Sequence, residues 1–251
     1  SGTCIPYADN SFDLVVIPML GIEEIVPIFG VIAETFRVLK PNGLLYFSTE
    51  NPNRLNTKCT GIFNFNENFN DGTISLELVK NRNKGPYLHD LSLEIRYANG
   101  NFEKKTFEQG LLTQEEWADL LKNAGFGDIK ISALGTDENF IPSVMNFLSI
   151  TSRKIGRDFE HKKSENSVTA FNFFNNVSNV YKDATEKEKY PVRNWLEKKL
   201  FEYHTKHPII LDIGSGRGIV GEVLKEVNCK PNRLYGIEIS NQMKSLTMLD
   251  G

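Results

Sequence analysis

The sequence has few of the residues that mark secreted, metal-bound or membrane-spanning proteins. Only three of its 251 residues are cysteines, and these are far apart, at Cys4, Cys59 and Cys229. Because there is no C-x-x-C pair and no His–Cys cluster, we expect neither a disulfide framework nor a structural zinc site, and reduced thiols favour a cytoplasmic protein. No apolar run reaches the length of a membrane span, so no membrane association is expected.

The chain also lacks a strong excess of charge of either sign. Its formal net charge is −3, with 24% charged, 40% hydrophobic and 11% aromatic residues. A balance of this kind provides no general attraction for nucleic acid, so no nucleic-acid partner is expected. The apolar content and the length suffice for one sizeable core, which fits a single α/β domain with an insertion.

Two common nucleotide-binding motifs are missing. No G-x-x-x-x-G-K-[ST] phosphate-binding loop occurs anywhere in the chain. The dinucleotide fingerprint G-x-G-x-x-G/A is not met either, because Ile219 occupies its third small position when the motif is counted from Gly214. Isoleucine at that position is too large for close packing of a helix against a strand.

A different glycine motif is present near the C-terminus, in residues 209–220 (IILDIGSGRGIV). An apolar run, an acid and three glycines at alternate positions predict a buried strand, a tight turn and a helix over 218–227. The glycines would let the backbone approach a ligand closely. A second strand is predicted over 233–240, and its acid, Glu238, follows the glycines by about twenty residues, where a carboxylate can accept both ribose hydroxyls. A nucleoside ligand is therefore expected.

These paired motifs resemble the class I S-adenosylmethionine-dependent methyltransferases, which carry D-x-G-x-G-x-G after their first strand and an acid at the end of their second. Residues 5–16 (IPYADNSFDLVV) are similar to the family segment that leads into its fourth strand. Residues 35–47 (TFRVLKPNGLLYF) are similar to its helix end, turn and fifth strand. The resemblance implies a Rossmann-like α/β sandwich, with a mostly parallel seven-stranded sheet and helices on both faces, and S-adenosyl-L-methionine as cofactor.

The motifs of the family's later half stand at the N-terminus here and those of its first half at the C-terminus. This order predicts a circularly permuted chain. Residues 1–154 would form the C-terminal half of the fold, 155–166 a linker, and 167–251 the N-terminal half with the glycine loop, all in one domain. Permutation at exposed loops is tolerated because domain termini often lie close together. The alternative is a piece of a longer tandem protein that carries the back half of one domain and the front half of the next.

The resemblance further implies one cofactor site around the glycine loop. Its expected members are Cys4, Ile5, Asp212, Gly214, Ser215, Gly216, Gly218, Glu238, Ile239 and Asp250. In this interpretation Asp212 orders the loop and the amino group of the cofactor, Glu238 holds the ribose, and Asp250 holds the adenine amino group. Cys4 and Ile5 would lie near the adenine ring.

Two features bear on the methyl acceptor. Amino-methyltransferases acting on DNA bases carry [DNS]-P-P-[YFW] after the fourth strand, whereas residues 17–20 here read IPML, which argues against base methylation. Residues 53–110 contain strand-like runs at 73–79, 91–97 and 102–107, and Asn99-Gly100 predicts a hairpin between the last two. This β-rich insertion resembles the added sheet that covers the active site in small-molecule methyltransferases.

Candidate substrate residues lie in and next to this insertion. Tyr87, Glu50 and Asn51 are expected near the substrate, and His89 is the preferred general base. Methyl transfer from a sulfonium is an in-line displacement, so alignment supplies much of the acceleration. A base is needed only when the attacking atom arrives protonated, and a histidine suits that task near neutral pH. No carboxylate-rich ligand set stands out, so no metal is expected.

Local patterns also predict helices. Apolar spacing predicts helices over 22–39 and 187–203, followed in the first case by a turn at 40–43 and a strand at 44–48. Thr113 and Glu116 have the spacing of a capping box at the start of a third helix. Further strands are expected at 129–134 and 145–151.

The sequence thus predicts an enzyme that transfers a methyl group from S-adenosylmethionine to an oxygen or nitrogen atom of a small molecule. It does not distinguish O, N or C as the acceptor atom, and it does not identify the acceptor. The alternative is a non-catalytic methyltransferase-like protein for binding or assembly, in which the C-terminal segment pairs with a second copy in a domain-swapped homodimer.

Overall fold

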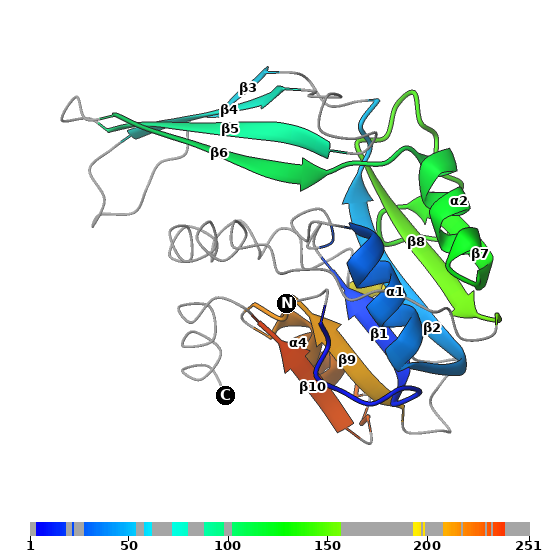
Figure 1. The fold of residues 1–251 in the computed structure, drawn as a ribbon. Helices are drawn as coiled ribbons and strands as arrows, with labels where there is room; N and C mark the ends of the chain where they lie inside the picture. Colours follow the sequence, from blue (N-terminus) through cyan, green and yellow to red (C-terminus); the bar gives the residue numbers. More distant parts are fainter. Residues whose placement is uncertain are drawn as a thin grey trace.

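The computed structural model describes residues 4–18, 22, 28–53, 58–61, 72–79, 88–97, 102–156, 193–196, 198, 208–216, 218–228, 230–231 and 233–238. These residues form two β-sheets, with helices packed against the larger one (Figure 1). The elements, in chain order, are β1 (Phe12–Ile17), α1 (Ile28–Val38), β2 (Leu39–Glu50), β3 (Lys58–Gly61), β4 (Gly72–Val79), β5 (Leu88–Tyr97), β6 (Phe102–Gly110), α2 (Gln114–Asn123), β7 (Phe126–Ala133), β8 (Phe147–Lys154), β9 (Ile209–Ile213), α4 (Ile219–Glu226) and β10 (Arg233–Ile237).

The larger sheet has the strand order β10-β9-β1-β2-β8-β7. The first four strands are parallel, whereas β8 runs antiparallel to both of its neighbours. Val15 of β1 lies between Leu211 of β9 and Leu45 of β2, so strands from the two ends of the chain share one sheet. The predicted Rossmann-like α/β fold is confirmed, with six strands among the described residues where seven were expected. Residues 239–251, which would follow β10, lie outside the described part.

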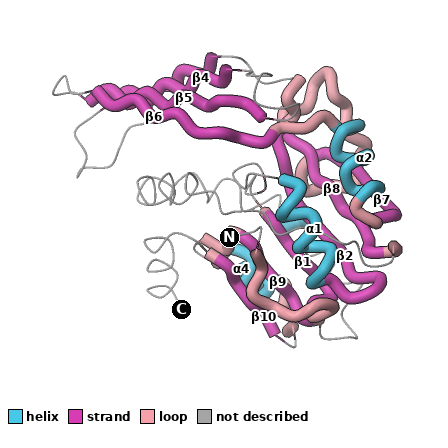
Figure 2. Tube along the Cα trace, viewed as in Figure 1, coloured by secondary structure: helices cyan, strands magenta, loops and turns pink. Residues whose placement is uncertain are grey.

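Apolar side chains fill both faces of this sheet. Helices α1 and α2 contribute to one of these layers and α4 to the other, and all three lie against the sheet (Figure 2). On one face Trp117 of α2 packs against Phe47 of β2, with ring centroids 4.7 Å apart. On the other face Trp195, in the helical stretch 193–196, stacks on Tyr46 with centroids 3.8 Å apart. The near-continuous burial of β1 and β9 is the expected consequence of parallel strands covered on both sides.

The junction between α1 and β2 differs from the prediction. The helix ends at Val38, and β2 already begins at Leu39, so the expected turn at 40–43 lies inside the strand as an irregularity. Partners along β1 jump from Leu39 to Leu44, which leaves the residues between them outside the regular ladder. A Cβ on Gly43 would lie 2.8 Å from the Lys40 carbonyl oxygen, so only glycine fits this bulge.

The smaller sheet has the antiparallel order β3-β4-β5-β6 and contains the predicted insertion. The three expected strands are found as β4, β5 and β6. Arg96 of β5 pairs with Phe102 of β6, which confirms the expected hairpin. β3 was not predicted. The sheet extends away from the carboxyl end of β2 (Figure 1).

The capping box predicted for α2 is confirmed atom by atom. The Glu116 backbone N–H donates to Thr113 Oγ1 at 3.3 Å, and the Thr113 backbone N–H donates to Glu116 Oε2 at 2.7 Å. These bonds satisfy two backbone donors that a helix start would leave without partners. They set the entry into α2, whose Trp117 and Leu121 are fully buried.

Replacing Thr113 with alanine is expected to lower the free energy of unfolding by about 1 kcal/mol, because the helix loses its side-chain cap. Urea denaturation followed by circular dichroism measures this change. Thr113→Ser keeps the hydroxyl and is expected to stay within about 0.5 kcal/mol of the original protein. Equal losses in both variants would mean that the threonine methyl, and not the cap, stabilises this site.

Candidate functional site

The glycine loop follows β9 at the carboxyl edge of the larger sheet. Gly214, Gly216 and Gly218 have φ values of 74°, 51° and 86°, in the left-handed region that favours glycine. The backbone N–H groups of Gly214 and Ser215 donate to the Ile237 carbonyl oxygen at 2.8 and 3.1 Å, which fastens the loop to the end of β10. A Cβ built on Gly214 meets nothing within 4 Å, so the backbone there borders open space.

Glu238 lies beside this loop, as its position after the second strand predicted. Its Oε2 accepts the Gly216 backbone N–H at 2.8 Å. The carboxylate is therefore held against the glycine backbone at the carboxyl ends of β9 and β10. In open α/β sheets this edge is where ligands bind.

Asp212 is buried in β9, as the last residue but one of that strand. It is 3% exposed, and its Oδ1 has no hydrogen-bond partner among the described residues. Burial, and to a smaller extent the charge of Glu238, raises the pKa of Asp212 to about 8. The carboxyl is thus mostly uncharged at neutral pH, and it carries an unused polar atom next to the loop.

Gly236 belongs to the site but was missed in the sequence. It pairs with Asp212 across β9 and β10, and a Cβ on it would lie 2.9 Å from Ser215 Oγ. The strand therefore needs glycine there to let the loop pack against it. A glycine inside an apolar strand was the available signal.

The segment before β1 is fastened to α1 by backbone bonds. Ile5 donates its N–H to Glu34 Oε2 at 2.9 Å, and its side chain is buried in the core. The Ile5 carbonyl oxygen accepts from Arg37 Nη2 at 2.9 Å, and the Tyr7 carbonyl oxygen accepts from Arg37 Nη1 at 2.8 Å. Cys4 precedes this anchored stretch and is exposed. The predicted adenine contacts of Cys4 and Ile5 stay predictions, and the geometry gives the Ile5 side chain a packing role.

Arg37 is the centre of that anchor. Its guanidinium binds Glu34 through two bonds, Nε to Oε1 at 2.8 Å and Nη2 to Oε2 at 2.9 Å, and it also binds Asp9 Oδ1 at 2.7 Å. The hydrogen bond to Glu34 raises the pKa of Arg37 further above its ordinary value. Glu34 is only 5% exposed, so this cation neutralises a buried carboxylate. Nothing in the local sequence pattern indicated this role.

The predicted substrate residues after β2 have different surroundings. Glu50 is the last residue of β2 and is partly buried. Asn51 is 2% exposed, and its Nδ2 donates to the carbonyl oxygens of Pro142 and Met145 at 2.9 and 2.8 Å. Its Oδ1 accepts the Asn53 N–H at 3.1 Å. The amide of Asn51 therefore fastens the turn before β8. The substrate contacts predicted for Glu50 and Asn51 stay predictions.

The other predicted site residues are not placed by the structure. Tyr87, Ile239 and Asp250 lie outside the described residues. The backbone of His89 lies in β5 opposite Gln109, while its side chain is outside the described part. Its role as a general base stays a prediction.

Two kinds of feature are missing from the described residues. They contain no group of three or more His, Cys, Asp or Glu side chains arranged to hold a metal ion. None of the helices formed by these same residues has the length and apolar character needed to span a bilayer.

Comparisons with known proteins found one family match and several similar solved structures. Residues 1–47 match the family described as a methyltransferase domain. A solved S-adenosylmethionine-dependent methyltransferase from Clostridium acetobutylicum ATCC 824 is similar at 11% identity over 62% of this chain and 63% of that one, with a TM-score of 0.47. The CcbJ methyltransferase from Streptomyces caelestis matches at 10% identity over 61% of each chain, with a TM-score of 0.48.

A putative DNA modification methylase from Thermus thermophilus, solved with S-adenosyl-L-methionine, matches over more of the chain. Its sequence is 13% identical to this one, the match covers 98% of this chain and 87% of that one, and the TM-score is 0.46. The chain spans less than two thirds of the length of the first two structures. No curated protein matches it.

Proposed function

We propose that this chain is a class I methyltransferase that transfers a methyl group from S-adenosylmethionine to an oxygen or nitrogen atom of a small molecule. The match of residues 1–47 to a methyltransferase domain and the Rossmann-like sheet support this proposal. The observation that carries this proposal is the grouping of Asp212, Glu238 and the left-handed glycines at one edge of the sheet. The absence of the base-methylating motif after β1 supports a small acceptor.

The residues at this edge fit the cofactor in three respects. Open space borders Gly214, so a ligand can lie against the bare backbone. The buried Oδ1 of Asp212 lacks a partner among the described residues, and an amino group would supply one. Glu238 accepts a backbone donor at Oε2, and a carboxylate has further lone pairs for ribose hydroxyls.

In the proposed mechanism the chain binds and aligns, and the cofactor supplies an electrophilic methyl on a sulfonium. The glycine backbone would lie beside the methionine part, Asp212 would hold the amino group, and Glu238 would hold the ribose. Positioning of this kind provides much of the acceleration in a displacement reaction. We propose the smaller sheet as a cover that excludes water, and His89 as the base that accepts the acceptor's proton when it has one.

We also propose that the chain is one circularly permuted domain. The pairing of β1 with β9 supports this, because a strand from the N-terminal part and a strand from the C-terminal part lie side by side in one chain. The competing proposal is a domain-swapped homodimer without catalytic activity. Light scattering separates the two, since a monomer that binds the cofactor supports the permuted domain and an obligate dimer without affinity supports the swap.

Replacing Glu238 with glutamine is expected to weaken binding of S-adenosylhomocysteine about tenfold. The variant keeps the shape but loses one acceptor oxygen and the charge, and a lost hydrogen bond to a charged group costs about 1–3 kcal/mol. Isothermal titration calorimetry measures the dissociation constant. Glu138→Gln, at an exposed glutamate, is the matched control and is expected to bind like the original protein. Failure of the original protein to bind would overturn the methyltransferase proposal.

A further inference from the structure

A pocket lies at the amino ends of the parallel strands, opposite to the end that carries the glycine loop. Its volume is about 390 Å³, and it is lined by Tyr7, Ser11, Phe12, Ile209, Arg233 and Tyr235. Phe12, Ile209 and Arg233 are the first residues of β1, β9 and β10, so the pocket opens at the amino ends of three parallel strands. The glycine loop follows the carboxyl end of β9, about 13 Å away along a five-residue strand. The proposed cofactor site therefore does not account for this pocket.

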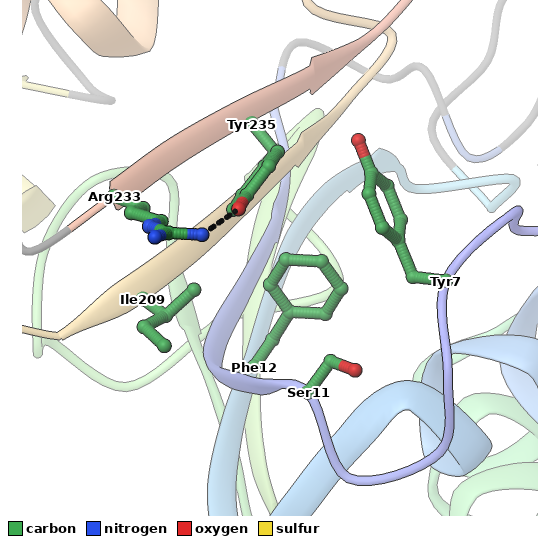
Figure 3. Close-up of a pocket in the computed structure, with 6 residues that line it drawn as sticks. All are labelled: Tyr7, Ser11, Phe12, Ile209, Arg233 and Tyr235. Carbon is green, nitrogen blue, oxygen red and sulfur yellow. Dashed lines mark hydrogen bonds between the residues drawn. The ribbon is translucent and has the colours of Figure 1, made fainter.

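Three aromatic rings form its apolar wall. The ring centroids of Tyr7 and Phe12 are 5.0 Å apart, those of Tyr7 and Tyr235 5.2 Å, and those of Phe12 and Tyr235 5.7 Å, all in edge-to-face arrangements. Figure 3 shows Phe12 between Tyr7 on the loop before β1 and Tyr235 on β10. Such a wall favours a flat aromatic guest, whose ring can pack edge-to-face or offset against the existing ones.

One cation stands at the rim. Arg233 Nη1 donates to the Tyr235 hydroxyl oxygen at 3.2 Å, and no carboxylate pairs with Arg233 among the described residues. The nearby Asp13 already binds Lys40 Nζ at 2.9 Å and the Ile209 N–H at 2.9 Å. The remaining N–H donors of Arg233 therefore bind no carboxylate among the described residues. A guanidinium is the group best suited to bind a carboxylate through two bonds.

The pocket wall is also held in place. Tyr7 belongs to the segment that Arg37 binds through the Tyr7 carbonyl oxygen, and Ser11 Oγ donates to the Ala8 carbonyl oxygen at 2.7 Å. Phe12 is fully buried at the floor. The pocket is thus a half-open depression with fixed walls and the exposed Arg233 at its rim, where a small ligand would stay partly in contact with water.

We infer that this pocket binds a small aromatic carboxylate of one or two rings, with the ring against the partly exposed Tyr7 and Tyr235 and the carboxylate on Arg233. This site is separate from the proposed cofactor site and does not depend on the proposed function. An aromatic acid bound in this pocket would not contact the glycine loop.

The test uses 1-naphthoate as the probe, and 1-naphthalenemethanol as its neutral counterpart. Protein-observed NMR of the full chain is expected to give a dissociation constant of about 1 mM for 1-naphthoate, the affinity expected for a ligand of this size. Shifts should concentrate on Tyr7, Ser11 and Tyr235. The neutral alcohol is expected to bind about tenfold more weakly, because it cannot pair with Arg233.

Two variants identify the anchor. Arg233→Gln is expected to raise the dissociation constant of 1-naphthoate about tenfold, so that the acid and the alcohol bind equally. Lys225→Gln, at an exposed lysine on α4, should change the dissociation constant of neither probe. Glu238→Gln should also leave the dissociation constant of 1-naphthoate unchanged, which separates this site from the proposed cofactor site. Equal affinity of the acid and the alcohol for the original protein, or shifts confined to residues 214–218, would overturn the inference.

Discussion

Replacing Asp212 with asparagine is expected to stabilise the free protein increasingly as pH rises from about 4 to 8. Burial raises the pKa of this carboxyl from its ordinary value of about 4 to about 8, so between these values the folded chain holds a proton that the unfolded chain has lost. The contribution to the free energy of unfolding is therefore complete below the unfolded pKa and is lost as pH rises to about 8. The loss is about 1.4 kcal/mol per pH unit within this window. Asparagine does not titrate.

Urea denaturation of both proteins at pH 5, 7 and 8.5 measures this effect. The free energy of unfolding of Asp212→Asn, relative to the original protein, is expected to increase by about 3 kcal/mol between pH 5 and 7. Asp119→Asn, at an exposed aspartate of α2, is the control and should show little change in this interval. A difference that stays constant across all three pH values would contradict a raised pKa at Asp212.

The same variant is expected to lose cofactor affinity. An ionised Asp212 can neutralise the amino group of the cofactor, and an amide cannot, so the dissociation constant for S-adenosylhomocysteine should rise at least about tenfold. Binding to the original protein at pH 7 should release close to one proton, because Asp212 must ionise. Calorimetry in buffers of different ionisation enthalpy measures that proton. Stability and binding would thus respond in opposite directions at one residue.

Replacing Arg37 with methionine is expected to lower the free energy of unfolding by about 3 to 5 kcal/mol. The guanidinium binds Glu34 through two bonds and holds the carbonyl oxygens of Ile5 and Tyr7. Its removal takes two charge-assisted hydrogen bonds from the buried Glu34 carboxylate, and breaking a buried pair on one side costs this amount. The segment that leads into β1 would lose its attachment to α1 at the same time.

A double variant separates charge from attachment. Glu34→Gln in the Arg37→Met background removes the buried charge and is expected to recover about 1–2 kcal/mol, although Ile5 and Tyr7 still lack their donor. Lys130→Met breaks an exposed pair with Asp137 and serves as the control, with an expected loss below about 1 kcal/mol. If Arg37→Met were no worse than Lys130→Met, the anchor would have no structural importance.

Local features of the fold could be predicted because their partners are neighbours in the chain. The capping box of Thr113 and Glu116 involves residues three apart, and the hairpin between β5 and β6 depends on its own turn. The strand, glycine turn and helix around residues 209–226 follow from spacing and from the left-handed angles that glycine permits. The resemblance carried by these motifs then supplied the Rossmann-like fold.

Other features were decided only by tertiary structure, because they depend on residues far apart in the chain. Arg37 reaches Ile5 and Tyr7, and Asn51 reaches Pro142 and Met145, and no local pattern marks such pairs. The raised pKa of Asp212 is a consequence of burial, which exists only once β1 and β10 have packed on either side of β9. The sequence by itself determined most of the described strands and helices, but not β3 or the bulge that replaces the expected turn at 40–43. Packing decided which polar groups were buried, and burial is what gives Asp212 and Arg37 their expected effects.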